Sequence, residues 1–378
     1  MTPARPQALR IGNLVASLPI IQGGMGVGVS LSGLAAAVAN EGGIGVIACA
    51  GIGMTEADFS QNYLAANTRA LRREIRRARE LTTGILGVNI MVALSNYDEL
   101  VKTAIEEGID IIFSGAGLPL DLPRHLTRGT PTKLVPIVSS GRAARIIAKR
   151  WTERYDYPPD AIVVEGSRAG GHLGFKPEQI DDPAYALELL LADVLAAMTP
   201  VEAKAGCSIP VIAGGGIYTG SDVHKFLQLG ASGVQMATRF VTTHECDAAR
   251  GFKQAYIQSR PEDIVIIKSP VGMPGRAIRN EFIDALNAGK KVPFTCAYHC
   301  ILTCDYATSP YCIAMALINA QRGRMGHGFA FAGSNAHRAT EIVSVRELIG
   351  SLLEEYRVAT SRSSAPRLEV ASSTVPPG

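Results

Sequence analysis

Eight short apolar runs lie between residues 19 and 238, and each ends in small or polar residues. The stretches between them, such as 34–40, 97–107, 142–150 and 221–229, have the spacing of amphipathic helices. Strands that alternate with helices eight times are typical of a TIM (β/α)8 barrel. The expected strands are Pro19–Gln22, Gly45–Ala50, Leu86–Met91, Ile111–Ser114, Leu134–Ser140, Ala161–Gly166, Val211–Gly216 and Gly233–Thr238.

A doubly wound sheet is the alternative α/β fold, because it also alternates strands and helices. That fold holds a dinucleotide on a Gly-x-Gly-x-x-Gly turn at the start of a helix. None of the eight runs is followed by this spacing, so the sequence favours the barrel.

The alternation of strands and helices ends near residue 250, where prolines interrupt the chain. We expect residues 1–250 to form the barrel and 251–325 to form a small helical subdomain that contains cysteines. Residues 326–358 are expected to supply a C-terminal helical segment that packs on the barrel. The tail 359–378 is rich in Ser, Arg and Pro and is expected to be disordered.

The composition excludes several classes of protein. Of 378 residues, 47% are hydrophobic and 19% charged, with a formal net charge of +3, as in globular proteins. The basic run 69–79 has the apolar spacing of one amphipathic helix, so no nucleic-acid partner is predicted. No apolar stretch reaches the roughly 20 residues of a membrane span, and the N-terminus lacks a signal-peptide core. We therefore expect a cytoplasmic protein without a membrane partner.

Chemistry in a TIM barrel takes place at the carboxyl ends of the strands. One expected strand ends in the acid Glu165, and the glycines after it lead to His172, which titrates near neutral pH. Asn89, Ser114 and Gly115 fall on the same rim. His172 is therefore a candidate catalytic residue, and a histidine in an ordinary glycine-rich turn is the alternative.

The loops after the seventh and eighth strands usually hold a phosphate in this fold. Here they contain Gly215, Gly216, Ala237 and Thr238. The backbone amides of these residues, with the Thr238 hydroxyl, can solvate a phosphate without any side-chain charge. The alternative is a tight turn that the glycines merely permit.

Six strand-end motifs are present, namely Pro19–Met25 (PIIQGGM), Gly87–Met91 (GVNIM), Gly115–Gly117 (GAG), Glu165–His172 (EGSRAGGH), Pro210–Ile217 (PVIAGGGI) and Thr238–Phe240 (TRF). As a set they resemble the nitronate monooxygenase family, formerly called 2-nitropropane dioxygenases. They are also similar to a sister group, the flavin-dependent enoyl-ACP reductases. Residues 11–245 carry the resemblance.

The resemblance implies a non-covalent FMN in the barrel, and His172 aligns with the active-site histidine. The residues implied to surround the flavin are Gly23, Met25, Asn89, Glu165, Gly171, Gly215, Gly216, Gln235, Ala237 and Thr238. Glu165 has an alternative interpretation, a strand-end carboxylate that holds local amides. Ser114, Gly115 and Arg276 are the candidate substrate contacts.

The implied reaction is oxidation of an alkyl nitronate by FMN and O2, which gives a carbonyl compound and nitrite. The sister group implies an alternative, an NAD(P)H-dependent flavin reductase that acts on enoyl-ACP or a quinone. A third hypothesis is an FMN and iron–sulfur electron-transfer module. In the first two, the partners are a small-molecule substrate and either O2 or NAD(P)H.

Four cysteines crowd into the segment after residue 295, at Cys296, Cys300, Cys304 and Cys312. Four thiolates could ligate an iron–sulfur cluster. A continuous helix would separate Cys296 from Cys304 by about 12 Å, so the chain would have to turn there. The alternative is a group of free thiols that act as small hydrophobic side chains.

Overall fold

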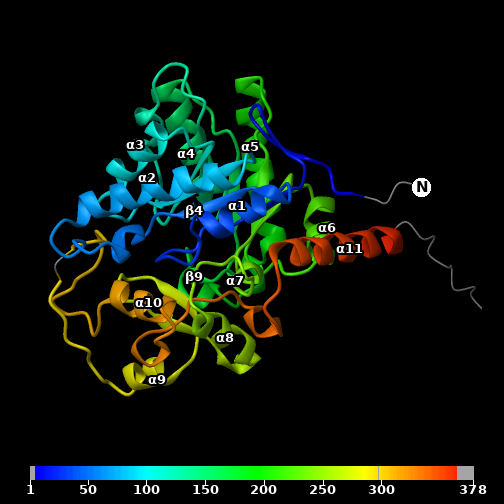
Figure 1. Cartoon of the computed structure of the whole chain (residues 1–378). Coiled ribbons are helices and arrows are strands. Elements are labelled where there is room, and N and C mark those ends of the chain that lie inside the picture. The colour runs from blue at the N-terminus through cyan, green and yellow to red at the C-terminus, as the bar shows by residue number, and fades with distance from the viewer. Residues whose placement is uncertain (1–4, 297, 364–378) are drawn as a thin grey trace, which may run out of the picture.

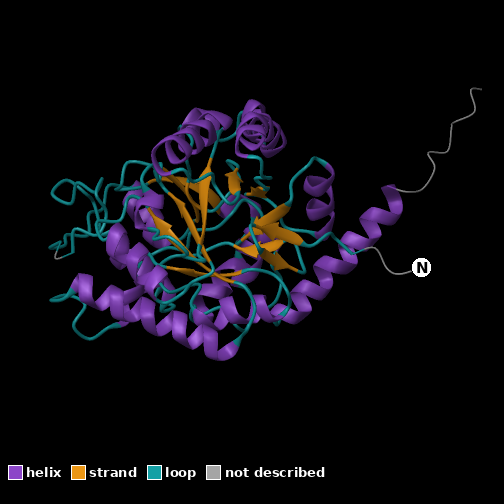
Figure 2. Cartoon of the chain, turned by 90° about the horizontal axis from the view of Figure 1, so that it is seen from above, coloured by secondary structure: helices purple, strands orange, loops and turns teal. Residues whose placement is uncertain are grey.

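The structure is a computed structural model that describes residues 5–296 and 298–363. Its centre is a ring of parallel strands surrounded by helices, seen from the side in Figure 1 and from above in Figure 2. Every strand expected in the barrel is present, so the predicted TIM barrel is confirmed. The strands are β3 (Ile20–Gln22), β4 (Gly45–Ala48), β5 (Leu86–Met91), β6 (Ile111–Gly115), β7 (Lys133–Val138), β8 (Ile162–Glu165), β10 (Val211–Gly214) and β11 (Gly233–Met236).

The sheet closes between its two end strands, β3 and β4. Ile21 and Ile44 form a parallel bridge. The Ile44 amide donates to the Ile20 carbonyl over 3.0 Å, and the Gln22 amide donates to the Ile44 carbonyl over 2.9 Å. Closure leaves the barrel without a free strand edge.

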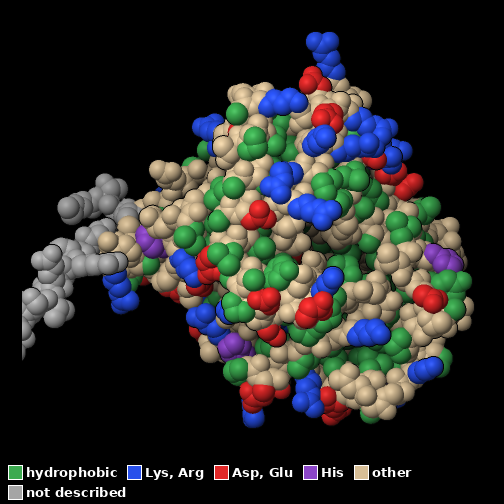
Figure 3. Space-filling view, turned by 180° about the vertical axis from the view of Figure 1, so that it is seen from behind, with side chains coloured by type: hydrophobic (Ala, Val, Ile, Leu, Met, Phe, Trp, Pro, Cys, Tyr) green, Lys and Arg blue, Asp and Glu red, His purple; other side chains and the backbone are tan. Residues whose placement is uncertain are grey.

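Amphipathic helices form the outer ring. The arginine-rich helix α2 buries Leu71 and Ile75 and turns its arginines to solvent, where Arg76 pairs with Glu107 at 2.7 Å. Basic and acidic side chains are interspersed over the face shown in Figure 3. The ring comprises α1 (Ser32–Asn40), α2 (Tyr63–Leu81), α3 (Tyr97–Glu106), α4 (Gly141–Tyr155), α5 (Leu187–Ala205), α6 (Gly220–Gln228) and α11 (Val345–Ser363), which packs on α6 and α1.

The barrel interior is filled by apolar side chains from alternate strand positions. Ile21, Val46 and Phe113 are among them, and each is almost fully buried. The hairpin β1 (Leu9–Ile11) and β2 (Leu14–Ala16) packs on the same cluster. The interior is therefore a packed core, and open space for a ligand lies at the carboxyl end.

Between the last barrel strand and α11 the chain makes a long excursion over the barrel rim. Its elements are α7 (Thr238–Val241), α8 (Arg250–Gln258), β12 (Ile264–Lys268), β13 (Pro274–Ile278), α9 (Glu281–Asn287) and α10 (Ile313–Gln321). The excursion is not the purely helical subdomain expected from the sequence. The β-branched run at 264–267 forms a strand instead, which pairs with β13.

The hairpin β12–β13 reaches back to the barrel. Strand β13 also pairs with β9 (Gly171–His172), the short strand that follows β8, so that Gly275 stands opposite His172. This three-stranded sheet lies over the carboxyl end of the barrel and fixes the backbone of His172.

The chain end differs from the expectation of disorder from residue 359. Helix α11 continues to Ser363, and the rest of the expected tail, 364–378, lies outside the described residues. Across the part of the chain that the structure describes, no helix is both long and apolar enough to cross a bilayer.

Candidate functional site

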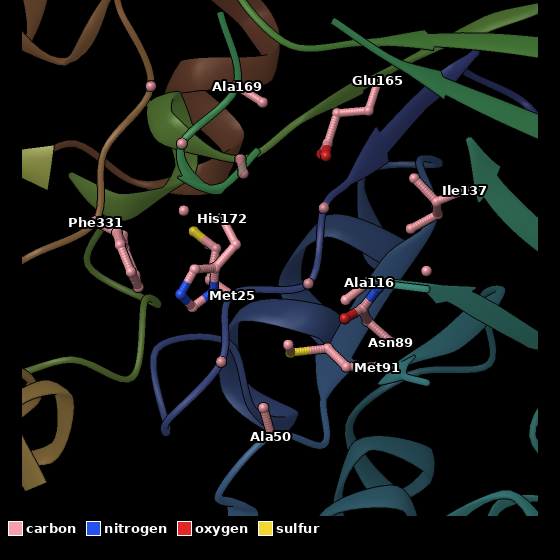
Figure 4. A pocket seen from close by; sticks show the side chains of 18 of the residues that line it. Met25, Ala50, Asn89, Met91, Ala116, Ile137, Glu165, Ala169, His172 and Phe331 are labelled. Atoms are coloured by element: carbon pink, nitrogen blue, oxygen red, sulfur yellow. The ribbon is translucent and has the colours of Figure 1, made fainter. Parts of the chain in front are cut away.

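A cavity of about 440 Å³ opens at the carboxyl end of the barrel, in the size range of small-molecule sites. Figure 4 shows His172 beside Phe331 and Met25, with Asn89, Met91 and Ala116 across the cavity. The structure thus brings together residues from many strand ends. The expected residues in its wall are Gly23, Met25, Asn89, Gly115, Glu165, Gly171, His172, Gly215, Gly216, Gln235, Ala237 and Thr238.

His172 is held by residues of the excursion. Its Nε2 lies 2.8 Å from the Ser269 hydroxyl, and its ring meets the Phe331 ring edge-on with centroids 4.9 Å apart. Burial lowers the pKa of His172 to about 4, because the enclosed site disfavours the imidazolium ion. At neutral pH the ring is therefore uncharged, with one nitrogen engaged by Ser269.

Ser269 was not identified from the sequence. It is 3% exposed and stands at the turn between β12 and β13, where its amide donates to the Met273 carbonyl over 3.1 Å. Ser269 lies 97 residues from His172, and no local pattern signals a contact over that separation.

Glu165 ends strand β8 and points into the cavity (Figure 4). Among the described residues no side chain or amide donates a hydrogen bond to its carboxyl, which argues against the alternative of a carboxylate holding local amides. Burial raises the pKa of Glu165 to about 7, since no charge or hydrogen bond from the residues that the structure describes offsets the desolvation of its carboxylate. This carboxyl titrates near neutrality in a site whose histidine is uncharged.

Close backbone approaches shape the floor of the cavity. A Cβ on Gly24 would lie 2.4 Å from the Asn89 Cβ, so the strand ends of β3 and β5 can meet only because residue 24 is glycine. A Cβ on Gly23 would make a less severe contact, 3.2 Å from the Gln235 Cγ. These glycines leave the Asn89 amide facing the cavity (Figure 4).

A backbone cradle that could hold an anion lies at the ends of β10 and β11. Gly215 and Gly216 have φ of 94° and 85°, a conformation that favours glycine, and a Cβ on Gly215 would meet the Gly166 carbonyl at 2.8 Å. The Gly333 amide donates to the Thr238 Oγ1 over 3.1 Å, and the Asn335 side chain donates to the Gly216 carbonyl over 2.7 Å.

The third side of this cradle, residues 333–335, was missed by sequence reasoning. The Ser334 hydroxyl is buried there and has no hydrogen-bond partner among the described residues. Such orphaned groups are rare in native proteins and call for a ligand or water. A signal was present, because Phe329–Asn335 is another apolar run that ends in Gly, Ser and Asn.

Arg168, an exposed residue, stands beside the cradle. It is the single Lys or Arg in the cavity wall as described, and its Cβ would lie 2.9 Å from a Cβ on Gly216. The sequence predicted a cradle made of amides and a hydroxyl alone. That expectation omitted this cation, which stands within the motif Glu165–His172.

Two of the expected substrate contacts do not line the cavity. The Ser114 hydroxyl is buried and donates to the Ile90 carbonyl over 3.0 Å. Arg276 is 6% exposed and donates to the Ser167 carbonyl over 2.8 Å. Both side chains are used in holding the structure of the rim. Gly115 remains in the wall.

The four clustered cysteines do not form a metal site in the described chain. All are free thiols, and no group of three or more His, Cys, Asp or Glu among the described residues is arranged to hold a metal ion. Burial, with a smaller effect from the neighbouring cysteines, raises the pKa of Cys300 to about 12. Cys300 lines the cavity, whereas Cys296, Cys304 and Cys312 do not. The iron–sulfur hypothesis therefore has no support.

Comparisons with known proteins agree with this geometry. The chain is 29% identical over 273 residues to "(3aS,4S,5R,7aS)-5-hydroxy-7a-methyl-1-oxo-octahydro-1H-indene-4-carboxyl-CoA dehydrogenase" of Mycobacterium tuberculosis (strain ATCC 25618 / H37Rv), a match that covers 72% of this chain and 66% of that protein. The chain thus spans slightly less than two thirds of that relative. It is 30% identical to a "Probable nitronate monooxygenase" of Staphylococcus aureus (strain Newman), over 71% of this chain and 77% of the relative.

A solved structure and a family model each match more of the chain than these two relatives do. FabK from Thermotoga maritima superposes with a TM-score of 0.72 at 28% identity, covering 92% of this chain and 94% of that one. The sequence model of the nitronate monooxygenase family matches residues 9–355. The barrel, the cavity at its carboxyl end and the match over nearly the whole chain lead to one conclusion: the protein belongs to the nitronate monooxygenase family of oxidoreductases.

Proposed function

We propose that the protein binds FMN in the barrel cavity and oxidises alkyl nitronates with O2 to a carbonyl compound and nitrite. The observation that carries the proposal is a neutral histidine, His172, facing a glycine-lined cavity that ends in an anion cradle. Family membership supports the reaction class.

The residues present fit an FMN. The buried Ser334 hydroxyl lacks a partner among the described residues, and Gly215 and Gly216 present amides where a side chain would fill the cradle. These groups, with Thr238 and Arg168, would hold the phosphate. The flavin, when bound, supplies the oxidation of the substrate and the reaction with O2.

His172 would bind and orient the nitronate. With Nε2 engaged by Ser269, the other ring nitrogen is left for chemistry. If Ser269 donates to Nε2, Nδ1 carries the proton and can donate a hydrogen bond to the anionic nitronate group. If Nε2 donates to Ser269, Nδ1 is the unprotonated acceptor and can remove the α-proton of a neutral nitroalkane.

A second candidate function is an NAD(P)H-dependent flavin reductase, which the likeness to FabK favours. The test is anaerobic stopped-flow absorbance of the flavin-loaded protein, mixed separately with propyl-1-nitronate, propionate 3-nitronate and NAD(P)H. Flavin reduction by a nitronate alone is expected. Rapid reduction by the nicotinamide, with none by either nitronate, would replace the monooxygenase proposal with the reductase.

Replacing Ser269 by alanine is expected to lower kcat about tenfold while FMN remains bound, since the variant loses one hydrogen bond that orients the His172 ring. Because Ser269 acts through His172, the pH profile of kcat/KM should shift on its acid side, and Ser269→Thr should restore it. Steady-state kinetics from pH 4 to 9 measure both effects. Equal loss in the alanine and threonine variants would show a structural role only.

Replacing Arg168 by glutamine is expected to weaken FMN binding by roughly tenfold to a hundredfold, the scale of a hydrogen bond to a charged group. Riboflavin, which lacks the phosphate, should bind both proteins equally. Quenching of flavin fluorescence measures both affinities. The matched control is Arg338→Gln, because Arg338 lies over the Tyr218 ring and not in the cavity wall. An unchanged FMN affinity in Arg168→Gln would remove this residue from the phosphate site.

A further inference from the structure

Part of the cavity wall is apolar, and we call this part the apolar compartment. Its wall includes Val27 and Met54 from the loops after β3 and β4, and Ala314 and Leu317 from helix α10. Val27, Met54 and Ala314 are each less than 10% exposed and belong to a satellite apolar cluster, which Leu317 and Cys300 border. The apolar compartment thus borders a packed apolar cluster and shares none of these residues with the anion cradle.

The cysteine-bearing loop, residues 298–304, contributes Cys300, Ile301 and Thr303 to the cavity wall, and we call this loop the roof. Backbone hydrogen bonds hold it in place. The Leu302 amide donates to the Ala93 carbonyl over 2.9 Å, and the Ser95 amide donates to the Cys300 carbonyl over 3.2 Å. The Tyr298 ring packs on Phe59 with centroids 4.7 Å apart. A roof with satisfied backbone groups forms the compartment before any ligand enters, which lowers the ordering cost of binding.

The wall residues assigned to the apolar compartment are all uncharged. Across the cavity wall as described, the Asp, Glu, Lys, Arg and His residues are Glu165, Arg168 and His172. Arg168 stands at the cradle against Gly216, and Glu165 ends strand β8. A second anionic group on a substrate would therefore be desolvated without a counterion, which is costly.

We propose that the compartment under residues 298–304 binds an uncharged hydrocarbon chain of the substrate, so that the enzyme prefers longer neutral alkyl nitronates and discriminates against nitronates with a carboxylate. This inference rests on the proposed function for the reaction. The preference for an uncharged alkyl chain is argued from the apolar, uncharged wall of the compartment.

The first experiment measures kcat/KM by nitrite release for ethyl, propyl-1-, butyl-1- and hexyl-1-nitronate with the FMN-loaded protein. Burial of each added methylene is expected to raise kcat/KM about fourfold until the compartment is full. Propionate 3-nitronate, in which a carboxylate replaces the terminal methyl of propyl-1-nitronate, should be slower by roughly a hundredfold. A flat series, or equal rates for that pair, would overturn the inference.

The second experiment measures binding without turnover. Ethanol, butan-1-ol and hexan-1-ol are titrated into the oxidised, FMN-loaded protein, and the flavin absorption spectrum reports occupancy. Affinity should rise about fourfold per methylene. Leu317→Phe, which fills the compartment, should flatten this series. Met315→Phe is the matched control on the same helix, because Met315 is 43% exposed and lies outside the cavity wall, and it should retain the series.

The two experiments separate the inference from the proposed function. If no nitronate is consumed but alcohol affinity rises with chain length in the wild type and not in Leu317→Phe, the reaction is wrong and the apolar compartment stands. If nitronates are oxidised but neither series depends on chain length, the reaction stands and the compartment does not bind the substrate chain.

Discussion

Replacing His172 by alanine is expected to leave FMN bound and to lower nitronate turnover about a hundredfold or more, the scale of a positioned proton-transfer or charge-stabilising group. The ring lies in the cavity wall, and one nitrogen is oriented by Ser269. Alanine removes the group that faces the substrate but does not alter the cradle at Gly215 and Gly216. Anaerobic flavin reduction and FMN content, measured on the same sample, separate the two roles.

His327→Ala is the matched control for this substitution, because His327 is exposed and outside the cavity wall. Its turnover should equal that of the wild type. Unchanged turnover in His172→Ala would remove this residue from the mechanism. Loss of FMN in that variant would instead assign His172 to cofactor binding.

Replacing Glu165 by glutamine is expected to abolish a pH dependence that the wild type shows near pH 7. The carboxyl of Glu165 has its pKa raised to about 7 by burial, so it is neutral at lower pH and charged at higher pH. The charged form places an anion in a cavity whose proposed substrate is an anionic nitronate. In the wild type, kcat/KM should therefore fall about tenfold for each pH unit above 7.

Glutamine cannot ionise, so Glu165→Gln should keep a flat profile and exceed the wild type by roughly a hundredfold at pH 9. Steady-state kinetics with propyl-1-nitronate from pH 5 to 9 measure this difference. The pKa of His172, lowered to about 4, places the imidazolium below this range, so protonation of that ring should not contribute. An inflection near pH 7 that persists in Glu165→Gln would assign the titration to another group.

The barrel could be predicted from sequence because its signals are local. Each strand is an apolar run that ends in a small or polar residue, and parallel strands of one sheet present those ends on one rim. Glu165, His172 and Gly215 were therefore predicted at the carboxyl end of the barrel, where they line the cavity. The closure of the sheet at Ile21 and Ile44 follows from the same repetition.

The rest of the site depends on contacts between distant segments, which carry no local signal. Ser269 meets His172 across 97 residues, and Gly333 meets Thr238 across 95 residues. Arg276 was predicted to contact an anionic substrate because its motif, Met273–Arg279, resembles a family feature near the site entrance. Its guanidinium instead donates to the carbonyls of residues 167 and 169. The cysteine spacing suggested a cluster site, but spacing alone does not fix the direction in which four thiols point. In the described chain these cysteines form no metal site.

The pairing of β9 with β13 divides the site between two parts of the molecule. The barrel strand ends and the loop at 333–335 supply the cradle, whereas the hairpin β12–β13 and the loop 298–304 supply the neighbours of His172 and the roof over the apolar compartment. Sequence changes within residues 264–304 can therefore alter which molecules reach the histidine without disturbing the ladder of hydrogen bonds that closes the barrel. Substrate selectivity can therefore change through substitutions in this segment while the residues that would hold the cofactor stay the same.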